Sequence, residues 1–115
     1  MRSMANLVVD ADTVTVSMSA LEKAEAIHGD VIVPRSAVTS VRAVPNGMAE
    51  IRGLRMPGTG FPGVVMVGTW RSGQDTTFAV CHGHGPAVVI DLAGQYFDRI
   101  VLTVDDPDEA VARFS

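Results

Sequence analysis

The sequence contains very little of what secreted and membrane proteins depend on. Its one cysteine, Cys81, excludes an intrachain disulfide and fits a reducing compartment. No apolar run approaches the roughly 20 residues that a membrane-spanning helix needs, and the first residues contain no apolar region typical of a signal peptide. We therefore expect a cytoplasmic protein without an integral membrane segment.

Aromatic residues and net charge are also scarce. Phe, Trp and Tyr make up 5% of the chain, and the formal net charge is −4. These values argue against a nucleic-acid binder, because such proteins need a basic surface and rings that stack on bases. With 47% apolar and 19% charged residues over 115 positions, the sequence predicts one globular domain that covers residues 1–115.

Positive charge gathers in the middle of this acidic chain. Residues 35–71 hold five arginines and one acidic residue, whereas both flanking segments are acidic. One interpretation is that these arginines pair with carboxylates of the flanks in the folded protein. The alternative is a basic surface that contacts an anionic partner.

Short apolar and alternating runs predict a fold made mainly of strands. Residues 13–18 alternate between apolar and polar side chains, as in a half-buried strand, and the apolar run 7–10 completes a hairpin with them. Short turns predict that the later strands form an antiparallel meander. The further expected strands are 30–33, 38–44, 64–71, 76–82, 87–92 and 99–104.

Two helices are expected beside these strands. The first begins at a capping box formed by Ser19 and Glu22, and Gly29 supplies its left-handed stop. The second closes the chain, with Asp106 at its N-cap and Pro107 at its first position. The predicted class is α+β and mainly β, with about seven to eight antiparallel strands in a partly open barrel or two packed sheets, capped by the C-terminal helix.

Residues 52–63 form the least regular segment of the sequence, with four glycines, two prolines and two arginines. The spacing of its glycines invites comparison with phosphate-binding loops. However, the Lys-Ser/Thr of such loops is absent and a strand follows instead of a helix. We therefore expect a rigid loop that contacts a protein partner through basic and apolar side chains. The candidate partner-binding residues are Arg52, Arg55, Met56 and Phe61.

One short segment contains residue types that bind metals. Cys81, His82 and His84 lie within four positions, and Asp91 follows on the next expected strand. These donors could bind zinc if they converged. Alternation along a strand, however, places Cys81 and His82 on opposite faces. No motif identifies a catalytic nucleophile, and we expect no cofactor.

Three segments resemble bacterial pleckstrin-homology-like domains. They are Gly-Val-Val-Met-Val-Gly-Thr-Trp at 63–70, Ala-Val-Val-Ile-Asp-Leu at 87–92, and Val-Leu-Thr-Val-Asp-Asp-Pro-Asp-Glu-Ala-Val at 101–111. The segment His-Gly-Asp-Val-Ile-Val-Pro-Arg-Ser-Ala-Val at 28–38 also resembles small uncharacterised actinobacterial proteins. The resemblance implies a partly open barrel of about seven strands, closed by a C-terminal helix and used as an interaction scaffold. Lipid-binding members carry basic residues in the first hairpin turn, where this chain has Asp10 and Asp12, so phosphoinositide binding is not implied.

Two functions follow as hypotheses. The first is a non-enzymatic scaffold domain that binds a protein partner or a second copy of itself, for which an exposed strand edge would serve. The alternative is a small metal- or ligand-binding protein, or an enzyme, that uses the segment Cys81-His82-Gly83-His84.

Overall fold

The computed structural model describes residues 5–61 and 63–115, so the N-terminal residues 1–4 and Pro62 lie outside the described part. The described chain is mainly β with two α-helices, as predicted. The helices are α1 (Ala20–Ala26) and α2 (Pro107–Ala112), with short 3₁₀ turns η1 (Arg35–Ala37) and η2 (Gly47–Glu50). The strands are β1 (Asn6–Val9), β2 (Thr13–Ser17), β3 (Val31–Pro34), β4 (Val38–Val44), β5 (Leu54–Phe61), β6 (Val65–Ser72), β7 (Asp75–His82), β8 (Ala87–Leu92) and β9 (Arg99–Thr103).

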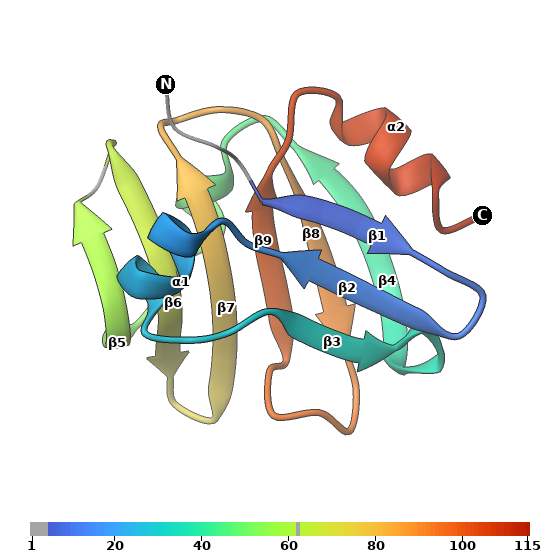
Figure 1. The fold of residues 1–115 in the computed structure, drawn as a ribbon, viewed down its shortest axis with the longest axis horizontal. Coiled ribbons are helices and arrows are strands. Elements are labelled where there is room, and N and C mark those ends of the chain that lie inside the picture. Colours follow the sequence, from blue (N-terminus) through green and yellow to red (C-terminus); the bar gives the residue numbers. More distant parts are fainter. Residues whose placement is uncertain (1–4, 62) are drawn as a thin grey trace.

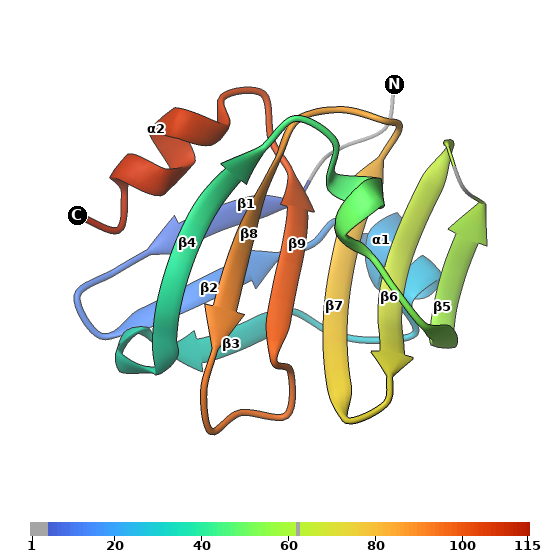
Figure 2. The same cartoon turned by 180° about the vertical axis from the view of Figure 1, so that it is seen from behind.

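The strands form two sheets that face each other (Figure 1). One has the order β1-β2-β3 and the other β4-β8-β9-β7-β6-β5. We call the face of the six-stranded sheet that is turned toward the three-stranded sheet its inner face, and the opposite face its outer face (Figure 2). Among the described residues, no helix has the length and apolar character needed to cross a membrane.

The predicted meander of neighbouring antiparallel strands is wrong at β9. This strand lies between β7 and β8, and it runs parallel to β7. Asp98 fixes the arrangement: its main-chain N–H donates to the Thr76 carbonyl at 2.8 Å, and its carboxylate accepts from the Thr76 N–H at 2.8 Å. The carbonyl of Asp98 accepts from Leu92 N–H. Because of this insertion, the turn after β7 crosses the end of β9 instead of closing a hairpin.

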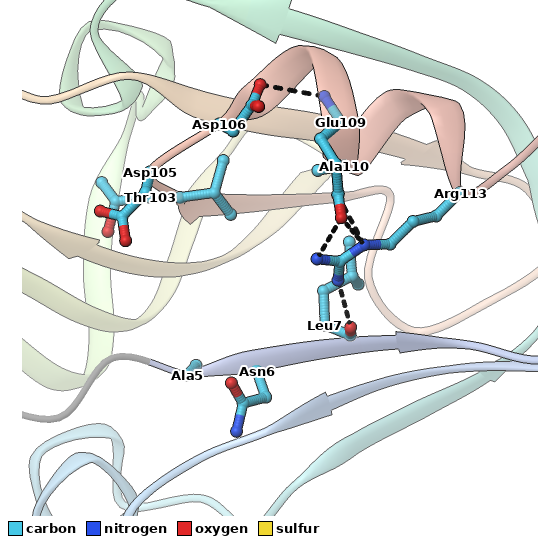
Figure 3. A pocket seen from close by; sticks show the side chains of 10 residues that line it. Ala5, Asn6, Leu7, Thr103, Asp105, Asp106, Glu109, Ala110 and Arg113 are labelled. Atoms are coloured by element: carbon cyan, nitrogen blue, oxygen red, sulfur yellow. Dashed lines mark hydrogen bonds and ion pairs between the residues drawn. The ribbon is translucent and has the colours of Figure 1, made fainter.

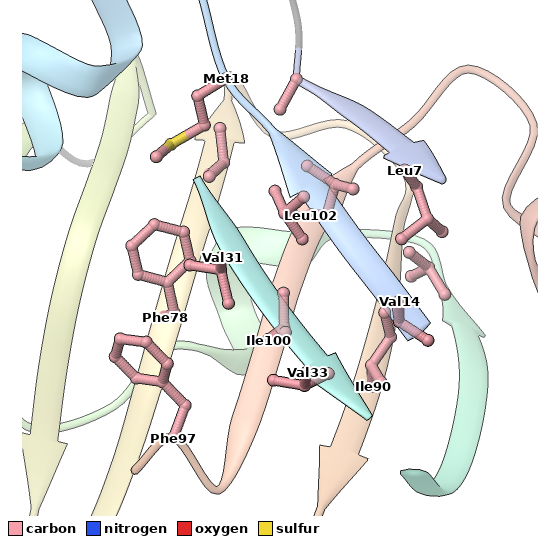
Figure 4. Packing of buried hydrophobic residues seen from close by; sticks show 14 of the residues in the cluster. Leu7, Val14, Met18, Val31, Val33, Phe78, Ile90, Phe97, Ile100 and Leu102 are labelled. Atoms are coloured by element: carbon pink, nitrogen blue, oxygen red, sulfur yellow. The ribbon is translucent and has the colours of Figure 1, made fainter. Parts of the chain in front are cut away.

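The main core lies between the two sheets (Figure 4). Alternation along β2 buries Val14 and Val16 while their polar neighbours stay outside, as predicted. The six-stranded sheet contributes large side chains to the same core, among them Phe78, Ile100 and Leu102, each 0% exposed. Burial of such a side chain stabilises a fold by about 1.5–3 kcal/mol, so the core between the two sheets is a major source of stability.

A second apolar cluster covers part of the outer face. Its buried members are Val44, Met48, Trp70, Ala79, Cys81, Ala87, Val89 and Val101. The turn η2 covers them and brings Gly47 against the sheet. A Cβ atom at Gly47 would lie 2.7 Å from the Cβ of Ala87, so only glycine fits this approach. Strands β7, β8 and β9 are therefore buried on both faces.

Both helices begin as predicted. Ser19 and Glu22 form the reciprocal capping box of α1, and Asp106 caps α2 through the N–H of Glu109 at 3.1 Å. The predicted stop of α1 is wrong, because Ile27, and not Gly29, adopts the left-handed conformation (φ 52°) at the helix end. Local sequence favours glycine there, yet the Ile27 side chain stays exposed and needs no room in the core.

Helix α2 closes the open side between β1 and β4 (Figure 2). Its Ala110 is buried, and Val111 and Phe114 pack against the main core. Arg113 donates to the Leu7 carbonyl of β1 at 2.8 Å, and Arg35 donates to the Phe114 carbonyl at 2.8 Å. The helix thus joins the two sheets, as expected from its apolar stripe.

Candidate functional site

The segment predicted to be a glycine-rich loop is mostly an edge strand. Strand β5 pairs antiparallel with β6 and is the last strand of its sheet. The register shifts between Arg55 and Gly58, so the strand contains a bulge. Gly58 has φ +147°, and a Cβ there would lie 2.6 Å from the Val67 carbonyl oxygen. The loop prediction was wrong because these glycines allow close strand pairing.

A shallow cavity of about 360 Å³ lies at the outer face of this edge. The missing side chain of Gly60 leaves part of this space empty. A Cβ on Gly60 would meet Trp70 Cζ2 at 3.1 Å and Arg55 Cδ at 3.4 Å. The Arg55 guanidinium also donates to the Gly60 carbonyl at 3.4 Å. The cavity therefore offers an indole edge beside a cation. Its lining residues are Gly53, Leu54, Arg55, Gly60, Met66 and Trp70.

Exposed apolar side chains are concentrated at the same edge. Nine large apolar residues are exposed in the described part of the chain, and four of them belong to β5 or to the turn that follows it. They are Leu54, Met56, Phe61 and Val64, from 43% to 79% exposed. Met56 and Phe61 are among the residues predicted from the sequence to contact a partner. Leu54 and Val64 were missed, because an apolar residue beside a strand is expected to be buried.

Of the five arginines of residues 35–71, Arg35 donates to main-chain carbonyls, and the other four divide into two groups. Arg42 pairs with Asp91 of the C-terminal flank at 3.9 Å, as the first interpretation of the charge pattern expects, and also with Glu50 of its own segment at 3.0 Å. By contrast, Arg52, Arg55 and Arg71 are exposed and form no ion pair within residues 5–61 and 63–115. Arg55 and Arg71 lie at the bulged end of β5, where Arg71 is the cross-strand partner of Leu54. This end of the sheet therefore carries uncompensated positive charge.

The candidate metal ligands do not converge. Cys81 is buried in the outer cluster, whereas His82 turns to the inner face, as alternation predicts. His84 lies in the turn after β7, beside Gly63. Asp91, on β8, pairs with Arg99 at 3.0 Å, near the end of the sheet opposite to this turn. No group of three possible ligands occurs in the part of the chain that the structure describes.

Burial also makes Cys81 a poor nucleophile. The thiol is 0% exposed, and loss of solvation raises its pKa from 9.0 to about 12. A hydrogen bond from the Thr103 backbone opposes this shift only in part. At neutral pH the sulfur is therefore a protonated apolar group that packs beside Val101.

The structure contains a buried acid–histidine pair that the sequence does not predict. Glu22, on α1, is 0% exposed, and its Oε2 lies 2.7 Å from His82 Nε2 on β7. The other oxygen accepts the Ser19 N–H of the capping box. His82 Nδ1 is buried without a hydrogen-bond partner among the described residues. Since one ring nitrogen is engaged and the other is closed to solvent, this pair fastens α1 to the sheet and cannot reach a substrate.

Only one member of this pair, Glu22, has a role that the sequence predicts. Glu22 was identified as a capping residue, and such residues usually face solvent. Nothing in the local pattern indicates that His82, 60 positions away, lies beside it. Only the position of α1 over β6, on the inner face, brings the two together.

Comparisons with protein-family models, with curated proteins and with solved structures find no match to this chain. What it binds is therefore inferred from its own side chains.

Proposed function

We propose that this chain is a non-enzymatic binding domain that takes up a protein partner along the free edge of β5. The supporting observation is that an edge strand coincides with exposed apolar groups and with arginines that form no ion pair among the described residues. Either feature alone is common on protein surfaces. Their coincidence on one strand is typical of a binding edge.

Main-chain hydrogen bonds would supply the first part of such an interaction. β5 bonds to β6 on one side, and its other side ends the sheet. An extended segment can add to such an edge as a further strand. Pro57 lacks an N–H and the bulge interrupts the ladder, so the regular template is Gly58–Phe61. The bound segment is therefore short.

Side chains would supply the selectivity. Arg55 and Arg71 favour acidic residues, and the exposed Leu54 and Phe61 favour apolar ones. β5 itself contains Arg55 and no acidic residue, so pairing with a second β5 brings no opposite charge. An acidic and apolar segment of another protein is therefore preferred over self-association.

We also propose that the chain is related to bacterial pleckstrin-homology-like domains and that its two sheets form a partly open barrel. Its support is the sequence resemblance, together with two facing sheets and a C-terminal helix. A related domain would have to accommodate the parallel pairing of β7 with β9. A cytoplasmic location is likewise proposed, from the single cysteine in its reduced form.

The proposal can be tested with random peptides displayed on phage and selected on the purified domain. Enriched peptides should combine acidic with apolar residues and should slow amide hydrogen exchange in Gly58–Phe61. The double variant Arg55→Glu, Arg71→Glu and the variant Phe61→Asp should each weaken binding at least roughly tenfold. Ala93→Glu adds an acid on an exposed loop outside β5 and should leave binding unchanged.

The opposite results would remove the proposal. Peptides without acidic excess, or equal binding by the charge-reversed domain, would exclude the arginine edge as the site. A dimer detected by sedimentation and abolished by Phe61→Asp would instead make a second copy the partner.

A further inference from the structure

A groove of about 420 Å³ lies between the start of β1 and α2, beside the end of β9, and Figure 3 shows it from close by. In Figure 1, α2 and β5 lie on opposite sides of the molecule. Its floor is the edge of β1, and one wall is the first turn of α2 with the residues before it. Figure 3 shows Arg113 reaching across the groove from the helix to the strand. The residues used in the argument are Leu7, Asp105, Asp106, Glu109 and Arg113.

The edge of β1 offers main-chain groups to this groove. The turn bond from Asp10 N–H to the Thr13 carbonyl sets the alternation of the β1–β2 ladder. Main-chain groups of Asn6 and Val8 therefore point to β2, and those of Leu7 and Val9 point to the free edge. The bond from Arg113 to the Leu7 carbonyl, at 2.8 Å, agrees with this assignment.

Acidic side chains dominate the wall. Asp105 and Asp106 are exposed and form no ion pair in the described ranges. Glu109 holds Arg113 in a two-pronged ion pair, with the shortest contact at 2.7 Å. Arg113, the one cation among the described residues that line the groove, is thus already neutralised, and the remaining charge of these residues is negative.

Arg113 also indicates what the groove accommodates. Its guanidinium donates to a carbonyl on the strand edge while a carboxylate holds it from the side. A lysine or arginine of an extended segment would find the same two kinds of acceptor, with Asp105 and Asp106 in addition. The free chain therefore occupies this position with its own basic side chain.

We propose that the groove binds an extended, basic segment of a partner protein, which adds to β1 as a strand and places a cationic side chain against Asp105 and Asp106. Arg113 leaves the Leu7 carbonyl when the segment binds. This site is independent of the β5 edge and has the opposite charge preference. The domain can therefore hold two different partners, one at each end.

The experiment uses the full chain and two acetylated hexapeptides in which valine alternates with lysine or with glutamate. The lysine peptide should bind in titration calorimetry at least roughly tenfold more tightly and should slow hydrogen exchange at the Leu7 and Val9 amides. A lysine peptide N-methylated at alternate positions cannot form the ladder and should lose most of this affinity. That comparison needs no variant of the protein.

Variants then test the side chains. Asp105→Asn with Asp106→Ser keeps a capping oxygen for α2 but removes two charges, and should weaken binding roughly fivefold. Asp10→Asn with Asp12→Asn removes the same charge from the hairpin turn after β1, which does not line the groove, and should have little effect. Arg113→Gln should strengthen binding, because it frees the Leu7 carbonyl.

Three results of the peptide experiment would overturn the proposal. They are no saturable binding of the lysine peptide, equal binding of the glutamate peptide, or protection confined to amides outside β1. Self-association that is lost in the Asp105→Asn, Asp106→Ser variant would also overturn it, since the occupant would then be a second copy.

Discussion

A single buried carboxylate connects the two kinds of structure in this chain. Glu22 completes the capping box of α1 and at the same time contacts His82 on β7. Both acceptor oxygens are therefore used within the protein. Removal of one member of a buried, hydrogen-bonded pair leaves the other without a partner, which usually costs more than the intact pair contributes.

We therefore expect Glu22→Ala to lower the free energy of unfolding by about 3 kcal/mol. The variant leaves His82 Nε2 and the Ser19 N–H without their acceptor and opens a cavity under α1. Urea unfolding followed by circular dichroism measures the effect. Leu21→Ala is the matched control, since its side chain is 56% exposed on the same helix and should change stability little.

A double-mutant cycle separates the pair from the cap. His82→Ala alone should also destabilise, and the two losses should be clearly less than additive when combined. Additive losses would mean that Glu22 acts through the capping box only.

The buried thiol of Cys81 makes stability depend on alkaline pH. Burial raises its pKa from 9.0 to about 12, so above pH 9 the unfolded chain loses the proton while the folded chain keeps it. The resulting stabilisation is complete below pH 9 and is lost as pH rises through about 12. The expected slope between these values is about 1.4 kcal/mol per pH unit.

Unfolding of the natural chain and of Cys81→Ala at pH 8, 9 and 10 isolates this effect, because other groups titrate in both proteins. The stability advantage of the natural chain should fall by about 1 kcal/mol between pH 9 and pH 10, because part of the unfolded thiol is already ionised at pH 9. A constant difference would show that Cys81 can ionise in the folded state as easily as in the unfolded one.

The pairing of strand β5 with β6 depends on glycine at position 58. Gly58 has φ +147°, and a Cβ there would approach the Val67 carbonyl oxygen to 2.6 Å and Gly68 Cα to 2.8 Å. Both atoms belong to the backbone of β6, which cannot move aside without breaking the ladder. The bulge of β5 thus depends on the absence of a side chain.

Gly58→Ala should therefore cost at least about 2 kcal/mol and should accelerate hydrogen exchange throughout β5. Gly73→Ala is the control. Gly73 has φ +61° in the β6–β7 turn, but its Cβ would meet no atom within 4 Å. The expected cost is only that of the left-handed conformation, about 1 kcal/mol. Equal effects of the two substitutions would show that β5 does not depend on close pairing.

The same strand shows what a sequence can and cannot predict. Local signals predicted the hairpin of β1 and β2, the capping box at Ser19 and the cap at Asp106, because each depends on neighbouring residues. The glycines at 58 and 60 were interpreted as loop formers, since their role depends on a second strand. The insertion of β9 was missed for the same reason.

The candidate edge was partly predictable. Arg55 and Phe61 stood out because basic and apolar residues were mixed in one irregular segment. Leu54 is exposed because β5 is the last strand of its sheet, and the order of the strands cannot be predicted from the sequence. His82 was considered as a metal ligand, whereas its contact with Glu22 required the tertiary fold.

The arrangement of the two sheets leaves charge of opposite sign at opposite ends. The β5 edge carries Arg55 and Arg71, and the groove beside α2 carries Asp105 and Asp106. Because β5 and β4 are the two edges of one six-stranded sheet, and α2 packs beside β4, these surfaces cannot merge. The basic middle and acidic end of the sequence thus become two separate surfaces in the folded chain.

Helix α2 should be necessary for the contact between the sheets. A chain shortened to end at Asp106 loses the buried Ala110 together with the partly buried Val111 and Phe114. It also loses the bond from Arg113 to the Leu7 carbonyl. We expect the free energy of unfolding to fall by roughly 3–5 kcal/mol, with increased binding of a hydrophobic dye as the core between β1 and β4 becomes exposed.

Two point variants show whether burial or hydrogen bonding carries this loss. Ala110→Asp places a carboxylate in the core beneath the helix and should reproduce most of the truncation effect. Arg113→Gln removes the bridge to β1 together with the exposed ion pair to Glu109 and should cost about 1 kcal/mol, while hydrogen exchange at the N–H groups along the free edge of β1 becomes faster. If the shortened chain unfolds at the same urea concentration as the full chain, α2 does not contribute to stability. The two sheets would then be held together only by the core between β2, β3 and the inner face.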